Sequence, residues 1–459
     1  MSALLINPPR RLRAGNIWKT IDRSLPPLGL GYIASYLEKH GVSVDVLDLQ
    51  AQSYTLEDVI AFARRRRPEV VGITATSVEV AGALYIAERI KSRMPDVKVV
   101  LGGSHASVMP EDVLQHAFVD VVVRGEGEEA MREIASGMPL DTIRGISYHA
   151  NGEIYHSPNR ELVKDLDSLP FPAYHLLPMR AYRPSSGNYR RLPAMSMITT
   201  RGCPGKCTFC HTEMFGHRTR FRSPRSIADE IKLLVRDYGI REISFYDDTF
   251  TARRRNVAEL CDILLCEKIG VTWSCMSRVD CVDAELLGAM KRAGCHQVGY
   301  GIESADEGIL SNVNKKIDLN EAAAAVKCTR DAGMDARVMF MLGNPGETAE
   351  TMEKTVRFAL SLDADIFVFN ITTPYPGTAM FQWARENGYL KTMDWAEYDL
   401  SKPVMELPTV SSGLVEEYYR RAYRRCYLRP RYLASRLLGI RSYEMLRMNV
   451  QTFWSMLRN

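Results

Sequence analysis

The sequence predicts an α/β protein in which a doubly wound parallel sheet is followed by a partial, six-stranded α/β barrel and a helical C-terminal segment. Short apolar runs alternate with helical patterns over residues 1–137, and this pattern changes over 138–193, which contain a stretch rich in prolines and aromatics at 165–184. Six strand-like runs separated by amphipathic patterns follow over 194–395, and residues 396–459 are predicted to be helical and are rich in arginine. Strands that alternate with helices are typical of parallel sheets.

Length and composition fit a large protein with more than one core. At 459 residues, 46% of them hydrophobic, the chain has room for two or three domains. The net charge of +4 is too small to indicate nucleic-acid binding. No apolar run reaches membrane-spanning length, and the first residues lack the basic start and the cleavage site of a signal peptide. We therefore expect a cytoplasmic protein without a membrane span and without nucleic acid as a partner.

The ten cysteines do not indicate a disulfide framework in a chain of this size. Seven of them are scattered singly through predicted strands and helices, where we expect small buried hydrophobic residues. These seven are Cys261, Cys266, Cys275, Cys281, Cys295, Cys328 and Cys426. A reducing compartment suits them.

Residues 1–137 contain the elements of the doubly wound sheet. The expected strands are residues 3–7, 44–49, 70–75, 97–101 and 121–123, and the expected helices are 28–40, 56–67 and 80–94. Ligands of such sheets bind beyond the carboxyl ends of the strands, where glycines let the backbone approach and hydroxyls donate hydrogen bonds. The candidate ligand-binding residues that follow these strands are Thr74, Ser77, Gly103, Ser104, His105, Gly125 and Glu126. His105 could instead hydrogen-bond its own loop.

Residues 138–193 join the two predicted units. Residues 146–155, with Asn151 and Gly152 at their centre, have the alternation and the turn dipeptide of a β-hairpin. The following stretch, residues 165–184, is rich in prolines and aromatics, which is typical of a linker laid along a surface.

The second unit, residues 194–395, has the pattern of a partial barrel. Its expected strands are 195–199, 242–246, 272–276, 297–301, 337–342 and 366–371, separated by helices such as 227–238, 257–266, 283–293 and 322–332. Six strands match a (β/α)6 barrel, because an eight-stranded barrel would need two more units. The chemistry of such barrels lies at the carboxyl ends of the strands.

The loop that follows the first barrel strand carries the strongest motif in the chain. It places Cys203, Cys207 and Cys210 close enough for three thiolates to converge on one inorganic centre. Three soft ligands suit an iron–sulfur cluster or a zinc ion. The next cysteine, Cys261, lies beyond a predicted helix and strand. One metal position is therefore expected to stay open.

The Cys-x3-Cys-x2-Cys spacing resembles the radical S-adenosylmethionine (SAM) superfamily. The Rossmann-like first unit and the run Pro26–Tyr32 resemble the branch of that family with an N-terminal cobalamin-binding domain. The resemblance covers nearly the whole chain. It implies a 4Fe-4S cluster whose open iron binds SAM, cleavage of SAM to methionine and a 5′-deoxyadenosyl radical, and removal of hydrogen from an unactivated carbon of the substrate.

One motif of other cobalamin proteins is missing. The sequence has no Asp-x-His-x-x-Gly motif, which supplies a histidine to cobalt in many of them. In the radical SAM branch this absence is ordinary and does not exclude cobalamin. The first sheet could also serve as a scaffold or a substrate wall without a corrinoid.

Residues after the barrel strands match the family's SAM-binding positions. The resemblance places Tyr246, Asp247 and Asp248 near the SAM amino group, although the two aspartates could instead cap the next turn. Arg278 is expected to pair with the SAM carboxylate, or with Asp280. The run Gly301 to Ser304 resembles the Gly-Ile-Glu-Ser signature, which places Glu303 and Ser304 near the SAM ribose or amino group. The loops 343–347 and 374–378 are expected near adenine or substrate.

Further candidates lie in and after the cysteine loop. Phe209 is expected near the adenine, or as a cover over the cluster. His211, Glu213 and His217 could protonate or bind a substrate. We take His211, Glu213 and Asp248 as candidate catalytic residues.

The arginine-rich C-terminal segment could bind an anionic substrate, a membrane surface or a partner, or form a solvated helical face. Its arginines are Arg420, Arg421, Arg424, Arg425, Arg429, Arg431, Arg436 and Arg441. We expect Tyr427, Tyr432, Phe453 and Trp454 to anchor the segment to the barrel.

The sequence favours a radical SAM enzyme that transfers a methyl group from cobalamin to a small polar substrate. A flavodoxin or ferredoxin is the expected electron donor. The alternatives are a radical SAM dehydratase, lyase or cyclase, for example one acting on a sugar diol of an aminoglycoside. An iron–sulfur electron carrier and a zinc-stabilised binding module are the alternatives outside this enzyme class.

Overall fold

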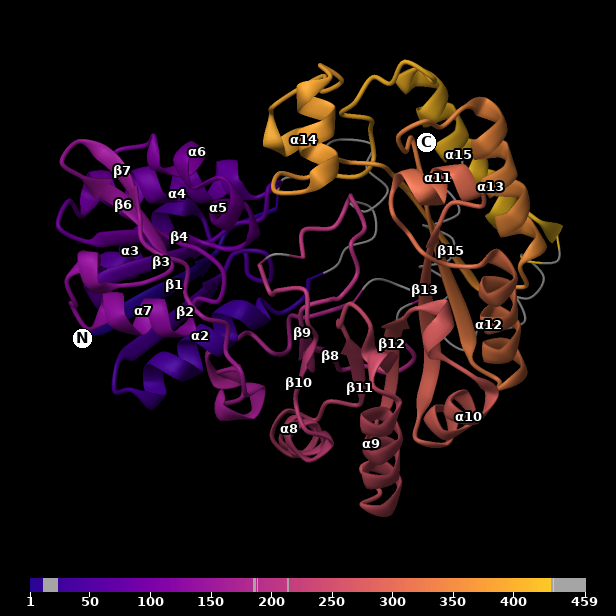
Figure 1. Ribbon diagram of the computed structural model, residues 1–459. Helices are drawn as coiled ribbons and strands as arrows, with labels where there is room; N and C mark the ends of the chain where they lie inside the picture. Colours follow the sequence, from indigo (N-terminus) through magenta and orange to yellow (C-terminus); the bar gives the residue numbers. More distant parts are fainter. Residues whose placement is uncertain (11–23, 185–186, 188, 213, 431, 433–459) are drawn as a thin grey trace.

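The computed structural model describes residues 1–10, 24–184, 187, 189–212, 214–430 and 432. Within them the chain forms two α/β units that lie side by side (Figure 1). No helix of the described residues is both long and apolar enough to cross a membrane.

The first unit is a seven-stranded sheet in the order β2-β1-β3-β4-β5-β6-β7. Its parallel strands are β1 (Ser2–Asn7), β2 (Ser43–Asp48), β3 (Val70–Thr74), β4 (Lys98–Gly102) and β5 (Val121–Val123). Its helices are α2 (Leu28–Lys39), α3 (Leu56–Arg66), α4 (Val80–Arg93), α5 (Ser104–Val108), α6 (Pro110–Leu114) and α7 (Glu128–Ala135). The five expected strands and three expected helices are confirmed, and α5, α6 and α7 are additions.

The predicted hairpin is present as β6 (Ile146–Ala150) and β7 (Glu153–His156). It is not part of the linker, because β6 pairs antiparallel with β5 and extends the first sheet. The alternating pattern identified the hairpin, whereas its pairing with β5 depends on contacts distant in sequence.

The second unit is a six-stranded parallel sheet in the order β15-β14-β13-β12-β11-β8, as expected for a partial barrel. Its strands are β8 (Ala194–Met197), β11 (Glu242–Phe245), β12 (Thr272–Ser277), β13 (Cys295–Glu303), β14 (Asp335–Leu342) and β15 (Ile366–Ile371). Its helices are α8 (Pro224–Tyr238), α9 (Arg254–Cys266), α10 (Ala284–Arg292), α11 (Glu307–Asn312), α12 (Leu319–Asp331), α13 (Ala349–Ser361), α14 (Ala379–Glu386) and α15 (Ser412–Tyr427). A short antiparallel ribbon of β9 (Thr200–Arg201) and β10 (Arg220–Phe221) encloses the cysteine loop.

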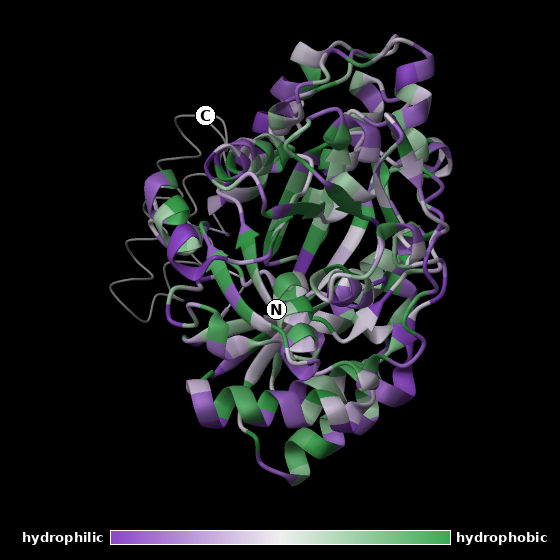
Figure 2. Ribbon diagram, turned by 90° about the vertical axis from the view of Figure 1, so that its left-hand side faces the viewer, coloured by the Kyte–Doolittle hydropathy of each residue, from purple (hydrophilic) through white to green (hydrophobic). Residues whose placement is uncertain are grey.

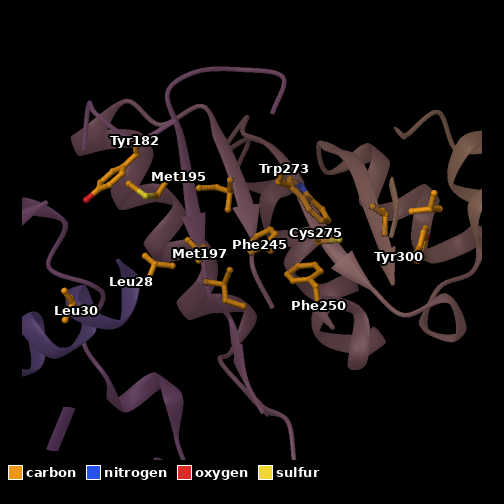
Figure 3. Packing of buried hydrophobic residues seen from close by; sticks show 14 of the residues in the cluster. Leu28, Leu30, Tyr182, Met195, Met197, Phe245, Phe250, Trp273, Cys275 and Tyr300 are labelled. Atoms are coloured by element: carbon orange, nitrogen blue, oxygen red, sulfur yellow. The ribbon is translucent and has the colours of Figure 1, made fainter. Parts of the chain in front are cut away.

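Apolar strands lie inside and polar helix faces lie outside (Figure 2). In the barrel, Phe245 stacks on Phe250 with ring centroids 4.4 Å apart, and Trp273 packs against both rings (Figure 3). This core continues through Met195 and Met197 of β8 towards α2 of the first unit. Shared packing of this kind favours a fixed relation between the two sheets.

The C-terminal part of the chain packs against both units. Phe381, Trp395 and Tyr398 are buried against one face of the first sheet. Helix α15 covers the edge of the barrel, where the hydroxyl of Tyr427 accepts a hydrogen bond from the backbone N–H of Phe367 and donates one to its carbonyl. Tyr427 therefore anchors this segment as expected, and the ring of Tyr432 lies 5.0 Å from the ring of Tyr427. Arg431, Arg436, Arg441, Phe453 and Trp454 lie outside the described residues.

Candidate active site between the two units

A cavity of about 300 Å³ lies between the two units. On one side it is lined by the carboxyl ends of β3, β4 and β5 with the loops that follow them, including Thr74, Gly103, Gly125, Glu126 and Glu128. On the other side it is lined by the segment that leads into and follows the cysteine loop, including Arg201, Gly202, Met214 and Phe215, and by Tyr246 and Asp248. The two sets of strand ends predicted to bind ligands therefore face one space.

Two glycines shape the first side of the cavity. Gly103 has a φ of +96°, and a Cβ there would lie 2.7 Å from the carbonyl oxygen of Ala75 and 2.8 Å from Oγ1 of Thr74. Gly125 has a φ of +77°, and its N–H donates a hydrogen bond to Oγ of Ser107. Thr74, Gly103, Gly125 and Glu126 line the cavity, as the sequence predicted.

His105 does not reach the cavity. It is fully buried, with Nδ1 3.1 Å from Oγ of Ser77 and Nε2 3.2 Å from Asp112. Trp395 packs edge-on against the imidazole and donates a hydrogen bond to Asp112 at 3.0 Å. The hydrogen bond from His105 keeps the pKa of the Asp112 carboxyl below its ordinary value. His105, Ser77 and Ser104 therefore do not line the cavity, and their binding of a ligand stays a prediction.

An ion-pair cluster connects the first sheet to the cysteine loop. Arg201 donates to Glu126 at 2.8 Å and to Glu128 at 2.6 Å, and Arg220 donates to Glu126 at 3.0 Å. Burial alone would lower the pKa of Arg201, but the carboxylates of Glu128 and Glu126 outweigh it and raise the pKa. The guanidinium also lies 5.3 Å from the centre of the Tyr32 ring. Because Arg201 precedes Gly202 and Cys203, this cluster fixes the start of the loop.

The cysteine loop itself is held by its backbone. The N–H of Gly205 points at Sγ of Cys203, 3.4 Å away, and the N–H of Thr208 bonds to the carbonyl of Val313. Burial raises the pKa of the Cys207 thiol, and it raises that of Cys210 to about 12 with help from the neighbouring Cys207. Without a metal these thiols stay protonated at neutral pH, so metal binding must release their protons.

Asp247 holds the strand that leads into the loop. Its carboxylate accepts hydrogen bonds from the backbone N–H groups of Thr199 and Thr200 and from both hydroxyls, all within 3.0 Å. Burial raises its pKa, and these hydrogen bonds oppose that shift. Asp247 is only 3% exposed and does not line the cavity. Asp247 therefore contacts the segment that leads into the cysteine loop, and its contact with a cofactor stays a prediction.

Asp248 and Tyr246 do line the cavity, as expected for cofactor-binding or catalytic residues. Desolvation by the surrounding protein raises the pKa of Asp248. Asp248 also acts electrostatically on the Cys210 thiol, which places the two groups close together. Its carboxylate has no hydrogen-bond partner among the described residues.

Glu303 lies beside the cysteine loop and forms an ion pair with Lys315. It has a φ of +71° at a β-bulge between β13 and β14, and Nζ of Lys315 lies 3.2 Å from its Oε1. Both side chains are 12% exposed. Burial would lower the pKa of Lys315, but the charges of Glu303 and Cys207 raise it. Ser304, in contrast, is fully buried with its hydroxyl 3.2 Å from that of Thr355, and its place near SAM stays a prediction.

Arg278 takes the alternative that the sequence left open. Its guanidinium donates to Asp280 through Nε at 2.9 Å and through Nη2 at 2.8 Å. Nη2 also donates to the carbonyl of Lys316. The hydrogen bond to Asp280 is the main cause of the raised pKa of Arg278. Arg278 therefore holds the segment that carries Lys315 through the carbonyl of Lys316. Part of its guanidinium is already used and is not free to pair with the SAM carboxylate.

The remaining candidates are close to the loop. Phe209 is half-buried against the core, and a Cβ added at Gly377 would lie 2.9 Å from Cδ2 of His211. Nδ1 of His217 lies 3.1 Å from the hydroxyl of Thr212. Glu213 lies outside the described residues. The structure thus brings Phe209 and His211 near the cysteines without a contact that fixes their roles.

Four residues of the site are not among the individual candidates named from the sequence: Glu128, which lies in a turn that the sequence did indicate, Arg201, Lys315 and Arg337. Arg337 lies on β14, where it, Met339 and Met341 are half-buried while the residues between them are buried. The half-buried set faces the barrel interior. Burial lowers the pKa of Arg337, and the Tyr246 phenol opposes this. A charged residue inside an otherwise apolar strand was the signal for Arg337. The other three depend on partners distant in sequence.

The residues fit the cofactors that the sequence suggested. Three thiols on one loop, with the cation of Lys315 beside them, suit an iron–sulfur cluster. Within the described residues no three cysteine, histidine or carboxylate side chains are already gathered around one point as ligands of a single metal ion. The three thiols would therefore come together when the cluster binds. The cavity walls next to the sheet are mostly apolar side chains and glycines, with Thr74, Glu126 and a buried carboxylate oxygen of Glu128 that lacks a partner. Such a surface suits a large, mostly apolar ring with polar side chains.

Comparison with known proteins agrees with this site. Residues 17–135 match a model described as a B12 binding domain, and residues 197–359 match the radical SAM superfamily. An uncharacterized methyltransferase of Pyrococcus horikoshii is 37% identical over 440 residues, covering 94% of each chain. The chain belongs to the B12-binding radical SAM enzymes. The expected fold class is thereby confirmed.

This B12-binding radical SAM enzyme has further relatives. An anaerobic magnesium-protoporphyrin IX monomethyl ester cyclase of Rubrivivax gelatinosus is 29% identical, covering 89% of this chain and 75% of the cyclase. The radical SAM methyltransferase TsrM of Kitasatospora setae, with cobalamin and a 4Fe-4S cluster bound, has a TM-score of 0.69 at 21% identity, covering 92% of this chain and 81% of TsrM. The cobalamin-dependent enzyme OxsB has a TM-score of 0.77 at 17% identity, covering 99% of this chain and 72% of OxsB.

Proposed function

We propose that this enzyme is a cobalamin-dependent radical SAM methyltransferase that acts on a small polar molecule. The observation that carries the proposal is the single cavity that the cysteine loop segment shares with the carboxyl ends of the first sheet. The methyltransferase relative that spans 94% of the chain supports methyl transfer. An external one-electron donor of the flavodoxin or ferredoxin type is part of the proposal.

The cysteine loop would hold the inorganic centre. Cys203, Cys207 and Cys210 would bind three irons and leave the fourth to SAM. When bound, the cluster supplies an electron to SAM, and cobalamin supplies the methyl group. Asp247 and Arg201 hold the two ends of the strand that leads into the loop.

Other residues would hold the reactants. The cavity-facing carboxylate of Asp248 can accept hydrogen bonds from the SAM ammonium group or from a substrate. Glu303, whose charge is balanced by Lys315, can accept from a ribose hydroxyl. Arg337 places positive charge inside the barrel, which favours a polar or anionic substrate there. The apolar walls of the cavity exclude water from the reacting groups.

The test uses anaerobically reconstituted full-length protein with hydroxocobalamin, SAM and dithionite. We expect both 5′-deoxyadenosine and S-adenosylhomocysteine, because a methyltransferase of this kind uses SAM as radical source and as methyl donor. A Cys203→Ala variant should form no 5′-deoxyadenosine above background. The proposal fails if the wild-type protein yields none either.

A cyclase is the second candidate, since cyclases are among the relatives that cover most of the chain. A cyclase would cleave SAM to 5′-deoxyadenosine without forming S-adenosylhomocysteine. The same assay therefore decides between the two functions before the substrate is known.

A further inference from the structure

One carboxylate oxygen of Glu128 accepts a hydrogen bond, and the other has no hydrogen-bond partner. Glu128 begins α7, is 4% exposed, and accepts a hydrogen bond from Arg201 on Oε1 at 2.6 Å. Its other oxygen, Oε2, is buried and has no hydrogen-bond partner. A buried carboxylate oxygen left unpaired is costly, and such atoms are rare in folded proteins.

The missing donor is expected from the cavity. Glu128 lines the cavity together with Gly125, Tyr32 and Met131, so the carboxylate belongs to its wall. Neither Gly125 nor Met131 carries a side-chain donor to a carboxylate. The Tyr32 hydroxyl accepts a hydrogen bond from Nη1 of Arg222 at 3.3 Å and makes none to Oε2 of Glu128. A ligand that fills the cavity can supply a donor to this oxygen.

We propose that Oε2 of Glu128 accepts a hydrogen bond from an amide N–H on a side chain of the bound corrinoid. This inference rests on the proposed function, because it requires a corrinoid in the cavity. Corrin rings carry several primary amides around an apolar macrocycle. An amide on the rim can reach a buried acceptor while the ring lies against the apolar wall. The carboxylate would then join the corrinoid, through Arg201, to the start of the cysteine loop.

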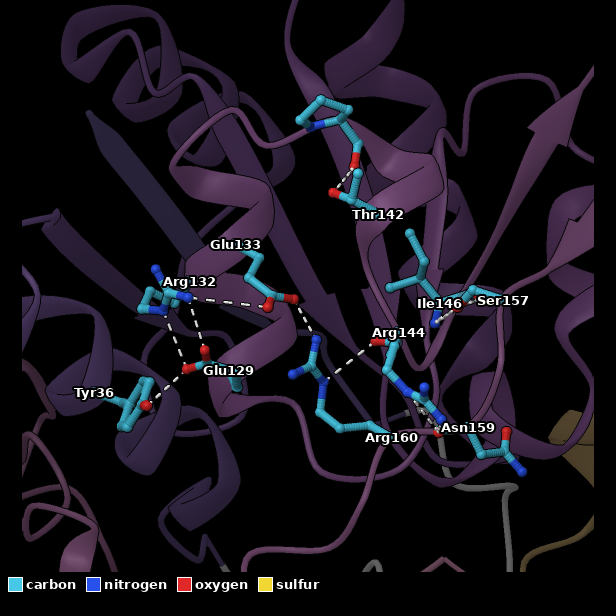
Figure 4. A network of polar contacts seen from close by, with 11 residues as sticks. Tyr36, Glu129, Arg132, Glu133, Thr142, Arg144, Ile146, Ser157, Asn159 and Arg160 are labelled. Atoms are coloured by element: carbon cyan, nitrogen blue, oxygen red, sulfur yellow. Dashed lines mark hydrogen bonds and ion pairs between the residues drawn. The ribbon is translucent and has the colours of Figure 1, made fainter.

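The next residue of the same helix offers a matched control. Glu129 points away to a separate network, in which its carboxylate accepts from the Tyr36 hydroxyl at 2.7 Å and from Arg132 (Figure 4). It does not line the cavity. Glu129→Gln therefore makes the same chemical change one residue away.

The first experiment measures cobalamin binding by the full-length reconstituted protein, from the absorbance change on adding hydroxocobalamin. Gln at 128 keeps a carbonyl for Arg201 but can place N–H2 where Oε2 was. We expect Glu128→Gln to raise Kd about tenfold to a hundredfold, because a hydrogen bond to a charged group is lost. Glu129→Gln should leave Kd unchanged, and iron content and circular dichroism should show that both variants are folded.

The second experiment uses hydroxocobalamin derivatives in which one amide at a time is replaced by a carboxylate. One derivative should bind the wild type much more weakly than the others, because its carboxylate meets Glu128. The same derivative should bind Glu128→Gln better than hydroxocobalamin does, because the glutamine N–H can donate to it. A purely structural role for Glu128 would not produce this exchange.

Failure of this inference can be distinguished from failure of the proposed function. The inference is overturned if the wild type binds cobalamin and Glu128→Gln binds it equally well, or if all the derivatives bind the wild type alike. The second comparison needs no variant, so it decides even if Glu128→Gln fails to fold. If the wild type retains no cobalamin at all, the proposed methyl transfer fails together with this inference.

Discussion

The carboxylate of Asp247 accepts one hydrogen bond from the backbone N–H of Thr199 and another from its hydroxyl, each at 2.7 Å. Thr199 precedes β9, the strand that leads into the cysteine loop. Asp247 follows β11, which pairs in parallel with β8. Its carboxylate therefore fixes the backbone that follows the last residue of β8.

Replacing Asp247 by Asn should weaken this anchor. The amide has one acceptor oxygen where the carboxylate has two, and its N–H2 would face the donors of Thr199 or Thr200. We expect a loss of about 2 kcal/mol or more in the free energy of unfolding, and less iron bound after reconstitution. Thermal unfolding of the apoprotein and an iron assay measure these effects. Asp248→Asn is the control, because Asp248 has no hydrogen-bond partner among the described residues. Equal loss of stability in both variants would contradict this role.

Gly202 should tolerate no side chain. Its φ is +89°, and a Cβ there would lie 2.5 Å from the carbonyl oxygen of Arg218 and 2.7 Å from that of Phe215. Gly202→Ala should destabilise the protein by about 1–3 kcal/mol and displace Cys203. The measurement is iron and sulfide content together with the absorbance of the reconstituted cluster.

The control for Gly202 is Gly413→Ala, at a helical position of α15 with no atom within 4 Å of the added Cβ. This variant should keep its iron and be as stable as the wild type or slightly more so. A Gly202→Ala protein that binds iron as well as Gly413→Ala would show that the loop can rearrange.

Periodicity and motif predicted the elements and the cysteine loop, because both are local properties of the sequence. All six barrel strands are where apolar runs predicted them, and the partner of Arg278 lies two residues away at Asp280. Local signals of this kind need no knowledge of the packing.

The rest could not be predicted, because the partners come together only in the folded chain. Glu128 meets Arg201 over 73 residues of sequence, and Trp395 reaches Asp112 over 283. Through the second contact, Asp112 joins His105 and Trp395 in one buried hydrogen-bond network. A strand-end position predicts where a residue lies, whereas its role depends on which neighbours use its polar atoms.

Lys315 should set the electrostatic environment of the cluster. It pairs with Glu303, and its positive charge opposes the rise in the pKa of Cys207 that burial causes. Lys315→Gln would leave Glu303 as a buried negative charge beside the thiolates. We expect the midpoint potential of the reconstituted cluster to become more negative, and 5′-deoxyadenosine formation to slow with dithionite limiting. A redox titration followed by electron paramagnetic resonance measures the potential.

The control for Lys315 is Lys316→Gln, one residue along the chain. Among the described residues its side chain forms no ion pair with Glu303 or another residue beside the cysteines, so this variant should leave the potential unchanged. If the potential of Lys315→Gln stays at the wild-type value, the charge of Lys315 does not act on the cluster.

Glu347 should make stability depend on pH. It is buried in the loop after β14, where its carboxylate accepts from the N–H groups of Gly343 and Asn344. Burial raises its pKa from 4.5 to about 7, against the effect of these hydrogen bonds. Because the folded protein holds this proton more tightly than the unfolded chain, its contribution to stability is complete below about pH 4.5 and is lost as the pH rises through about 7.

Glu347→Gln supplies a neutral side chain of the same shape at every pH. Between about pH 6 and about pH 8 the wild type should lose about 1.3 kcal/mol of stability relative to this variant. The measurement is the difference in melting temperature between the two proteins at each pH, which cancels the titration of all other groups. A difference that stays constant across this range would mean that Glu347 is already ionised at about pH 6, with its charge stabilised by the two backbone N–H groups.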